Sequence, residues 1–169
     1  SEVTGEATME LEVKIRGLMM DPVTNMPVVV LKETTGSGVL PIWVGIYEAN
    51  AIALEIEKVQ TPRPMTHDLL KNVLTGLNVH VQRVVVSDLK DDTFYALIWM
   101  ERDGQTMSMD SRPSDALALA LRLDCPIYVE DEVLKHSRMS TAVSEKSSSE
   151  DLRKWLENLN DEDLGRYKM

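Results

Sequence analysis

The chain has 169 residues but only one cysteine, Cys125, and three histidines. A single cysteine excludes an internal disulfide and suits a reducing compartment, so we predict a cytoplasmic protein. Cys125 follows an apolar segment and precedes Pro126, which indicates a buried structural thiol rather than a nucleophile. Three histidines (His67, His80 and His136) are too few for a histidine-rich metal site.

Long apolar runs and an excess of basic charge are also missing. No run approaches the roughly 20 apolar residues of a transmembrane helix, and residues 1–8 lack the apolar core of a signal peptide. We therefore predict no membrane partner. The 18 Lys and Arg against 28 Asp and Glu give a net charge of −10. Because cationic contacts to phosphates drive nucleic-acid binding, a nucleic-acid site here needs a local basic patch or a recruited divalent cation.

The same order of predicted elements occurs twice in the sequence: three β-rich segments are followed by an apolar helical pattern. The predicted strands are 9–19, 27–31, 39–44, 79–87, 93–101, 106–109 and 126–129. The predicted helices are 46–59, 67–74, 113–123 and 131–139. Alternating Ala and Leu over 116–121 fits a strand, but the alanine content favours a helix. The expected fold class is α+β: two antiparallel or mixed β-meanders, each followed by apolar helices, packed as one compact domain with a C-terminal helical appendage.

Composition divides the chain into four segments. They are an N-terminus that is disordered or derived from cloning (1–8), the folded domain (9–139), a small-residue polar linker (140–149) and an amphipathic helix with a tail (150–169). The last segment can dock on its own domain or on a neighbouring subunit.

Two short segments share one order of chemical groups. One reads Arg63-Pro64-Met65-Thr66-His67-Asp68, and the other reads Arg112-Pro113-Ser114-Asp115. Both precede apolar helices, with Thr66 and Ser114 as candidate N-caps. The N-terminus of a helix attracts anions through its free N–H groups. We therefore hypothesise that the two helix starts point at one place.

Several motifs resemble the bifunctional nuclease family, whose bacterial members were long described as a domain of unknown function. The motifs are Leu40-Pro41-Ile42-Trp43-Val44-Gly45, Glu48-Ala49, Arg63 to Leu70, Thr93-Phe94-Tyr95-Ala96, Asp110 to Ala120 and Pro126-Ile127-Tyr128-Val129. Their order and spacing match over about residues 9–138. The resemblance implies a compact α+β domain, usually a homo-oligomer (a dimer or higher), and nuclease activity on RNA and DNA. It implies no role for any single residue.

Residue chemistry supplies the candidate site. His67 and Asp68 are candidate catalytic residues, with His67 as general base or metal ligand. Arg63 and Arg112 are candidate phosphate ligands, and Glu48, Asp110 and Asp115 are candidate ligands of Mg²⁺ or Mn²⁺. Each has a structural alternative: a loop hydrogen bond for the histidine, ion pairs for the arginines and helix-dipole complements for the aspartates. Trp43, Phe94, Tyr95 and Trp99 can stack on bases, but in strands they are more often core or interface residues.

Three functions remain open at this point. The first is a nuclease that hydrolyses phosphodiester bonds in RNA, DNA or both, with or without a divalent metal such as Mg²⁺ or Mn²⁺. The second is a non-catalytic oligomeric regulator or scaffold in which Arg, His and Asp form a buried polar lock. The third is a module that binds a small anion or nucleotide at the same helix N-termini. An open cluster of polar groups favours the first or third, whereas burial with every group paired favours the second.

Overall fold

The computed structural model describes residues 9–143 of the chain, with side chains described up to residue 137. The predicted N-terminal stretch 1–8 and the predicted C-terminal helix lie outside these residues. The elements are β1 (Glu10–Met20), β2 (Pro27–Glu33), β3 (Val39–Trp43), α1 (Ile46–Ile56), α2 (Thr66–Gly76), β4 (His80–Lys90), β5 (Thr93–Arg102), β6 (Gln105–Ser111), α3 (Pro113–Leu123), β7 (Ile127–Glu130) and α4 (Asp131–Val143).

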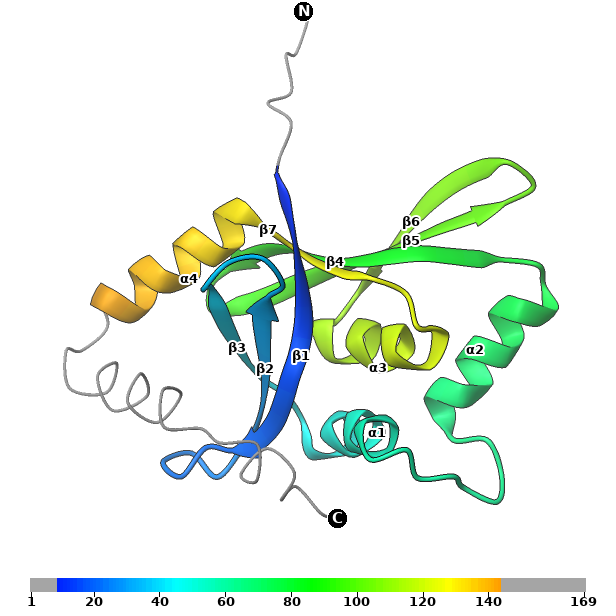
Figure 1. The fold of residues 1–169 in the computed structure, drawn as a ribbon, viewed down its shortest axis with the longest axis horizontal. Coiled ribbons are helices and arrows are strands. Elements are labelled where there is room, and N and C mark those ends of the chain that lie inside the picture. The colour runs from blue at the N-terminus through cyan, green and yellow to red at the C-terminus, as the bar shows by residue number, and fades with distance from the viewer. Residues whose placement is uncertain (1–8, 144–169) are drawn as a thin grey trace, which may run out of the picture.

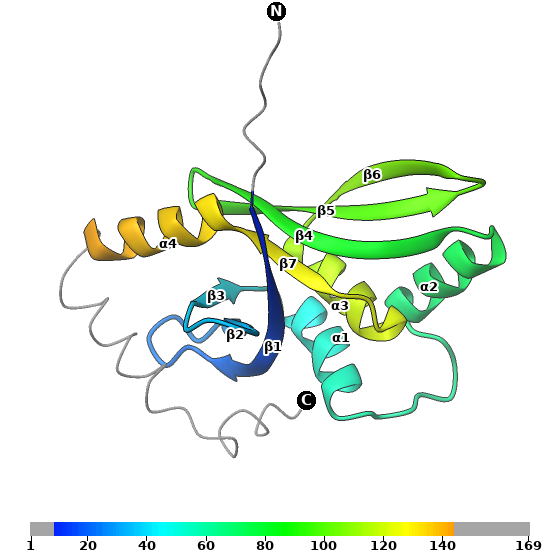
Figure 2. The same cartoon turned by 45° about the horizontal axis from the view of Figure 1, so that its top comes forward.

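The two predicted meanders form one seven-stranded mixed sheet in the order β3-β2-β1-β7-β4-β5-β6. β7 joins them, because it pairs antiparallel with β1 and parallel with β4. The sheet bends between β1 and β4, and α1 and α3 lie in the angle between its two halves (Figures 1 and 2). The predicted α+β class with two meanders is thus confirmed. None of the described helices is long and apolar enough to span a membrane.

α3 forms the centre of the core. Its residues from Ala116 to Ala120 are all at most 1 % exposed, and they pack with buried residues of α1, α4 and both meanders. A helix that is covered on all sides needs no polar face. This explains why its sequence alternates between Ala and Leu instead of following a helical period.

α2 is attached differently, at the margin of the domain (Figure 2). None of its residues is fully buried, although Leu74 packs partly against the core. Its neighbour is α3. Because little apolar area holds α2, the polar contacts of its first turn decide where it lies.

Four helix ends differ from the prediction. α1 ends at Ile56 rather than Val59, because Lys58 is left-handed (φ 54°) and Val59 N–H donates to the Leu54 carbonyl. This hydrogen bond is part of a Schellman motif, in which the residue after the left-handed one bonds back to the last turn. Val59 therefore caps the helix but does not belong to it. α2 begins at Thr66 instead of residue 67, with Met65 as its N-cap, and it ends at Gly76 instead of residue 74. α4 continues to Val143, so the first four residues of the predicted linker 140–149 are helical.

The capping predictions for Thr66 and Ser114 are wrong. The N-cap of α3 is Arg112, with Pro113 in the first helical turn. Proline is favoured there because its missing N–H has no partner in the first turn. Both hydroxyl residues therefore lie one to two positions inside their helices, and neither makes the expected cap hydrogen bond.

Asp21 fixes the turn between β1 and β2 to the end of β3. Its carboxylate accepts hydrogen bonds from Val23 N–H (2.9 Å), the Thr24 hydroxyl (2.9 Å) and Trp43 Nε1–H (2.9 Å). Burial alone would raise the pKa of Asp21, but these donors outweigh it and lower the pKa. Trp43 thus has a structural partner.

We expect Asp21→Asn to lower the free energy of unfolding at neutral pH by about 1.5 kcal/mol, the lower end of the range for a hydrogen bond to a charged group. The folded pKa lies below the unfolded value of about 3.9, so the wild-type advantage is complete above about pH 5. It disappears as the pH falls through the folded pKa. Urea unfolding of both proteins from pH 7 to pH 3 measures this difference. A wild-type advantage that grows on acidification would contradict the prediction.

Candidate active site at two helix N-termini

The first turns of α2 and α3 meet through their side chains. His67 Nε2 lies 2.9 Å from Asp115 Oδ1, although the two residues are 48 positions apart in the sequence. The ring of His67 is 12 % exposed and the carboxylate of Asp115 is 30 % exposed. The two segments with Arg-Pro sequences therefore supply neighbouring groups, as hypothesised.

Arg112 extends this pair to a third helix. Its Nε donates to Asp115 Oδ2 (2.9 Å), and its Nη2 lies 2.8 Å from Glu48 Oε1 at the start of α1. We call Glu48, His67, Arg112 and Asp115 the His67 network. The guanidinium of Arg112 is 65 % exposed, so it bridges two carboxylates while still facing solvent.

The network holds Asp115 in its charged form. Burial alone would raise the pKa of Asp115, but hydrogen bonds from His67 and Arg112 outweigh that effect and lower the pKa. The hydrogen bond to Asp115, followed by the one to Glu48, raises the pKa of Arg112. At neutral pH the network therefore contains a carboxylate beside an imidazole and a permanent cation.

The His67 network lies within a recognised family domain. The model of the bifunctional nuclease domain matches residues 29–142, a span that contains all four network residues and excludes the whole of β1. The chain belongs to this family. An uncharacterized protein of Mycobacterium tuberculosis is 43 % identical over 123 residues, which cover 73 % of each chain.

Plant members of the family are more distant. Bifunctional nuclease 1 of Arabidopsis thaliana is 28 % identical over 127 residues, covering 73 % of this chain and 39 % of the plant protein. Bifunctional nuclease 1 of Oryza sativa subsp. indica is 26 % identical over 125 residues, covering 72 % and 38 %. The match thus extends over less than half of each plant nuclease.

Asp68, the other candidate catalytic residue of this family member, lies in a separate cluster. Its carboxylate accepts from Met65 N–H (2.9 Å) and from Nε of Arg122 on α3 (2.8 Å). The Arg122 side chain is only 2 % exposed, and it also donates to the Ala118 and Ala51 carbonyls at 2.9 and 3.0 Å. We call Asp68 and Arg122 the α2 lock, because the pair joins α2 to α3 and, through Ala51, to α1.

Electrostatics keep the α2 lock ionised. Burial alone would raise the pKa of Asp68, but the Met65 N–H, the Arg122 side chain and the charge of Lys71 outweigh it and lower the pKa. Glu55 Oε1 lies 3.9 Å from Arg122 Nε and adds a second, weaker carboxylate. Asp68 is therefore engaged in holding α2, whereas His67 one residue earlier faces the other cluster.

Arg122 was missed by sequence reasoning, although a signal was present. It is the one charged residue between Ala116 and Leu123, in a segment whose other members are Ala and Leu. A cation within a buried helix needs an anionic partner. That rule predicts a carboxylate nearby, but the sequence does not say which of the acidic residues supplies it.

Two other candidates lie apart from the His67 network. Arg63 is exposed in the proline-rich connector, and its side chain makes no hydrogen bond or ion pair with residues 9–143. Asp110 is exposed on β6, and its side chain likewise has no described partner. Within the described part of the chain, no group of three or more His, Cys, Asp or Glu side chains is arranged to hold a metal ion.

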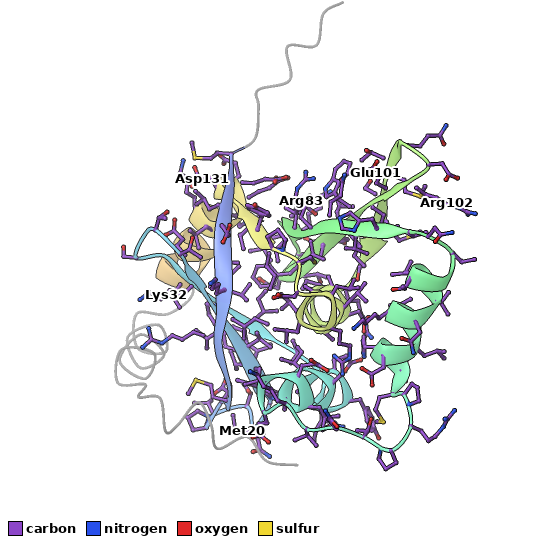
Figure 3. The ribbon with its side chains drawn as sticks, turned by 45° about the vertical axis from the view of Figure 1, so that its right-hand side comes forward. Met20, Lys32, Arg83, Glu101, Arg102 and Asp131 are labelled. Carbon is purple, nitrogen blue, oxygen red and sulfur yellow. The ribbon has the colours of Figure 1, made fainter. Side chains whose placement is uncertain are left out.

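Tyr95 and Trp99 lie on the sheet face opposite α3, together with two cations. The guanidinium of Arg83 lies 4.8 Å from the Trp99 ring centroid, and Lys90 Nζ lies 5.7 Å from that of Tyr95. Figure 3 shows Arg83 and Glu101 projecting from β4 and β5 on this side. Carboxylates surround the cations: Glu10 accepts from Arg83 at 3.0 and 3.1 Å.

This face does not favour phosphates. Burial, followed by the charges of Glu10 and Asp88, raises the pKa of Glu130, which indicates a negative potential between β1, β7 and β4. The stacking of bases on Tyr95 and Trp99 stays a prediction that these carboxylates oppose. Cys125 offers no alternative nucleophile, because burial raises the pKa of its thiol to about 11 and keeps it protonated at neutral pH.

Proposed function

We propose that this protein cleaves phosphodiester bonds in RNA or DNA, with His67 as general base and Arg112 as phosphate ligand. One observation carries the proposal: an imidazole paired with a carboxylate, beside a half-exposed arginine, at two adjoining helix N-termini. Family membership and the plant relatives named as nucleases support the reaction type. General acid–base groups need this arrangement of a base and a residue that orients it.

The hydrogen bond between His67 and Asp115 decides which nitrogen acts. A neutral imidazole that donates from Nε2 to the carboxylate keeps its lone pair on Nδ1. Nδ1 then takes the proton of the attacking hydroxyl, which is water or, in RNA, the neighbouring 2′-OH. The new P–O bond forms as the bond to the leaving oxygen breaks, and that oxygen takes up a proton. Asp115 is a positioning residue that stabilises the resulting imidazolium.

Arg112 supplies the countercharge for the phosphate. Its planar fork can bind two non-bridging oxygens, and its large exposed fraction leaves donors free for a ligand. Glu48 holds the guanidinium from the other side. The helix N-termini of α2 and α3 add N–H dipoles of the right sign. Glu48 and Asp115 offset the charge of Arg112, so the attraction for a phosphate comes from its exposed N–H donors and the two helix N-termini.

The residues present do not fit a bound Mg²⁺ or Mn²⁺ in their observed arrangement. Glu48 and Asp115, two of the three candidate ligands, both bind Arg112, so a divalent cation between them would have to displace the guanidinium. Asp110, the third, makes no contact with this group. The proposed reaction therefore assigns no step to a metal.

The proposal predicts that cleavage continues in EDTA. Single-stranded RNA and DNA of defined sequence are incubated with highly purified full-length protein in EDTA, Mg²⁺ or Mn²⁺, and the products are separated on denaturing gels. We expect cleavage in all three conditions. A His67→Ala protein purified in parallel controls for contaminating nucleases, because its preparation carries the same contaminants.

Other outcomes have distinct meanings. Cleavage that requires a metal would overturn the role of Arg112 and restore Glu48 and Asp115 as ligands. No cleavage in any condition would overturn the nuclease proposal. It would leave the non-catalytic scaffold, which the α2 lock favours because Arg122 is buried and donates to Asp68 and to two backbone carbonyls.

A further inference from the structure

The half of the sheet that contains β1, β2 and β3 is apolar on both faces. Its central strand, β2, contains Val28, Val29 and Val30 in succession. Successive residues of a strand point to opposite faces, so Val29 faces the main core with α1, whereas Val28 and Val30 point away from it. α1 and α3 lie in the angle of the sheet, on the side of Val29 (Figures 1 and 2). A strand that is apolar on both faces is typical of a sheet with a layer on each side.

The face away from α1, which we call the outer face, is as buried as the core. Its centre consists of Met19, Val28 and Val30, which are 6 %, 0 % and 1 % exposed and form a cluster separate from the main core. Neighbouring strands do not explain this burial. Val30 lies between Gly17 and Pro41 in register, and glycine has no side chain that could cover it. The outer face therefore needs atoms packed above it.

The described helices do not supply this cover. α1 contacts β1 and β2, but its buried residues belong to the main core. α4 contacts β3, and its buried Val133 and Leu134 also belong to the main core. Among the residues whose side chains are described, Val39 is the only further apolar residue in the outer-face cluster. The cover must come from the chain beyond residue 137 or from another molecule.

The C-terminal segment 150–159 has the pattern that such a cover needs. Its apolar residues recur at the spacing i, i+3, i+4 and i+7, which places them on one side of the predicted helix: Leu152, Trp155, Leu156 and Leu159. Residues 144–149 connect this segment to α4 and can span up to about 20 Å when extended. α4 itself contacts β3, at the margin of the outer face. The matched family domain ends at residue 142, so the segment lies outside it.

Charge on the outer face also suits this segment. Lys14 and Lys32 lie opposite each other in register, on the same face as Val30, and neither forms an ion pair with a described residue. Like charges that face each other across two strands are destabilising. The C-terminal segment begins with Glu150 and Asp151, whose carboxylates can offset the two lysines.

We propose that residues 150–159 dock on the outer face of their own chain, with their apolar side against Met19, Val28 and Val30. The segment then forms the second layer of this half of the sheet, and Glu150 and Asp151 lie near the lysine pair. A short linker gives a tethered segment a millimolar effective concentration, so the chain's own segment outcompetes that of a second copy. This docking is independent of the proposed cleavage of phosphodiester bonds.

Thiol labelling of the full chain tests the docking. In a Cys125→Ala background, Val30→Cys places a thiol under the proposed cover, and Val29→Cys places one on the same strand under α1. We expect both thiols to react slowly with a maleimide dye. The further changes Trp155→Ala/Leu156→Ala should speed labelling at position 30 by about tenfold or more and leave position 29 unchanged, because only the outer face opens. Lys154→Ala, on the opposite side of the predicted helix, is the control and should change neither rate.

Three results would overturn the proposal. An unchanged rate at position 30 would show that the segment does not cover the outer face. Equal acceleration at positions 29 and 30 would indicate a general loss of stability. Protection at position 30 that falls on dilution would assign the cover to a second copy. If Val30→Cys fails to fold, Val28→Cys on the same face replaces it, and in the otherwise wild-type chain Leu156→Ala, unlike Lys154→Ala, should lower the urea midpoint.

Discussion

Asp68→Ala is expected to destabilise the protein by about 3–5 kcal/mol, the range found when one partner of a buried ion pair is removed. The Arg122 side chain is 2 % exposed and would keep its charge with only Glu55, at 3.9 Å, as a carboxylate partner. α2 has no fully buried residue, so packing cannot compensate for the lost pair. Urea unfolding followed by circular dichroism measures the change in free energy.

Two further variants make this result specific to the α2 lock. Asp110→Ala removes an exposed aspartate with no described partner, and it should change stability by less than about 0.5 kcal/mol. The double variant Asp68→Ala/Arg122→Leu should be more stable than the sum of the single changes predicts, by about 1 kcal/mol or more, because no buried charge remains. A loss below about 1 kcal/mol for Asp68→Ala would contradict the lock. It would return Asp68 to the list of candidate catalytic groups.

The sequence predicted most of the fold because its signals were local. β-branched runs, Asp-Gly and Gly-Ser-Gly turns, and proline at the start of α3 each act over a few residues. The end of α1 was less accurate, since the left-handed residue Lys58 closes this helix without a glycine. The pairing of β7 with both β1 and β4 joins segments that are distant in the sequence, so no local pattern predicts it.

The candidate site was predictable as a meeting of two helix starts, but its partners were not. His67 and Asp68 are adjacent in sequence and were assigned one shared role. On a helix, adjacent residues point about 100° apart. His67 therefore reaches Asp115, and Asp68 reaches Arg122. The same rotation separates a candidate catalytic group from a structural one, and only the relative placement of α1, α2 and α3 shows which is which.

The division into two clusters implies that α2 links stability to the candidate site. The α2 lock holds the first turn of α2, and His67 belongs to that same turn. Loss of the lock would therefore loosen His67 from Asp115 as well. For this reason a variant at Asp68 that lowers cleavage is not by itself proof of a catalytic role. The comparison must use protein that is shown to be folded.

His67→Ala is expected to lower the rate of phosphodiester cleavage by about 10²- to 10⁴-fold, the usual contribution of a general acid–base group. The ring contacts Asp115 through one nitrogen, so its removal takes away the base while leaving the Arg112–Asp115 and Arg112–Glu48 pairs intact. Stability should change little compared with Asp68→Ala. Initial rates on the cleaved oligonucleotide, at saturating substrate, measure the effect on kcat.

Asp115→Asn and His80→Ala complete this test. The Asp115→Asn side chain would keep a hydrogen-bond acceptor for His67 but lose the charge that stabilises the imidazolium. The rate should therefore fall. His80 is an exposed histidine on β4 outside the network, and its removal should leave the rate unchanged. A His67→Ala protein as active as His80→Ala would refute the base assignment. An Asp115→Asn protein that cleaves as fast as wild type would contradict the role of Asp115 in stabilising the imidazolium.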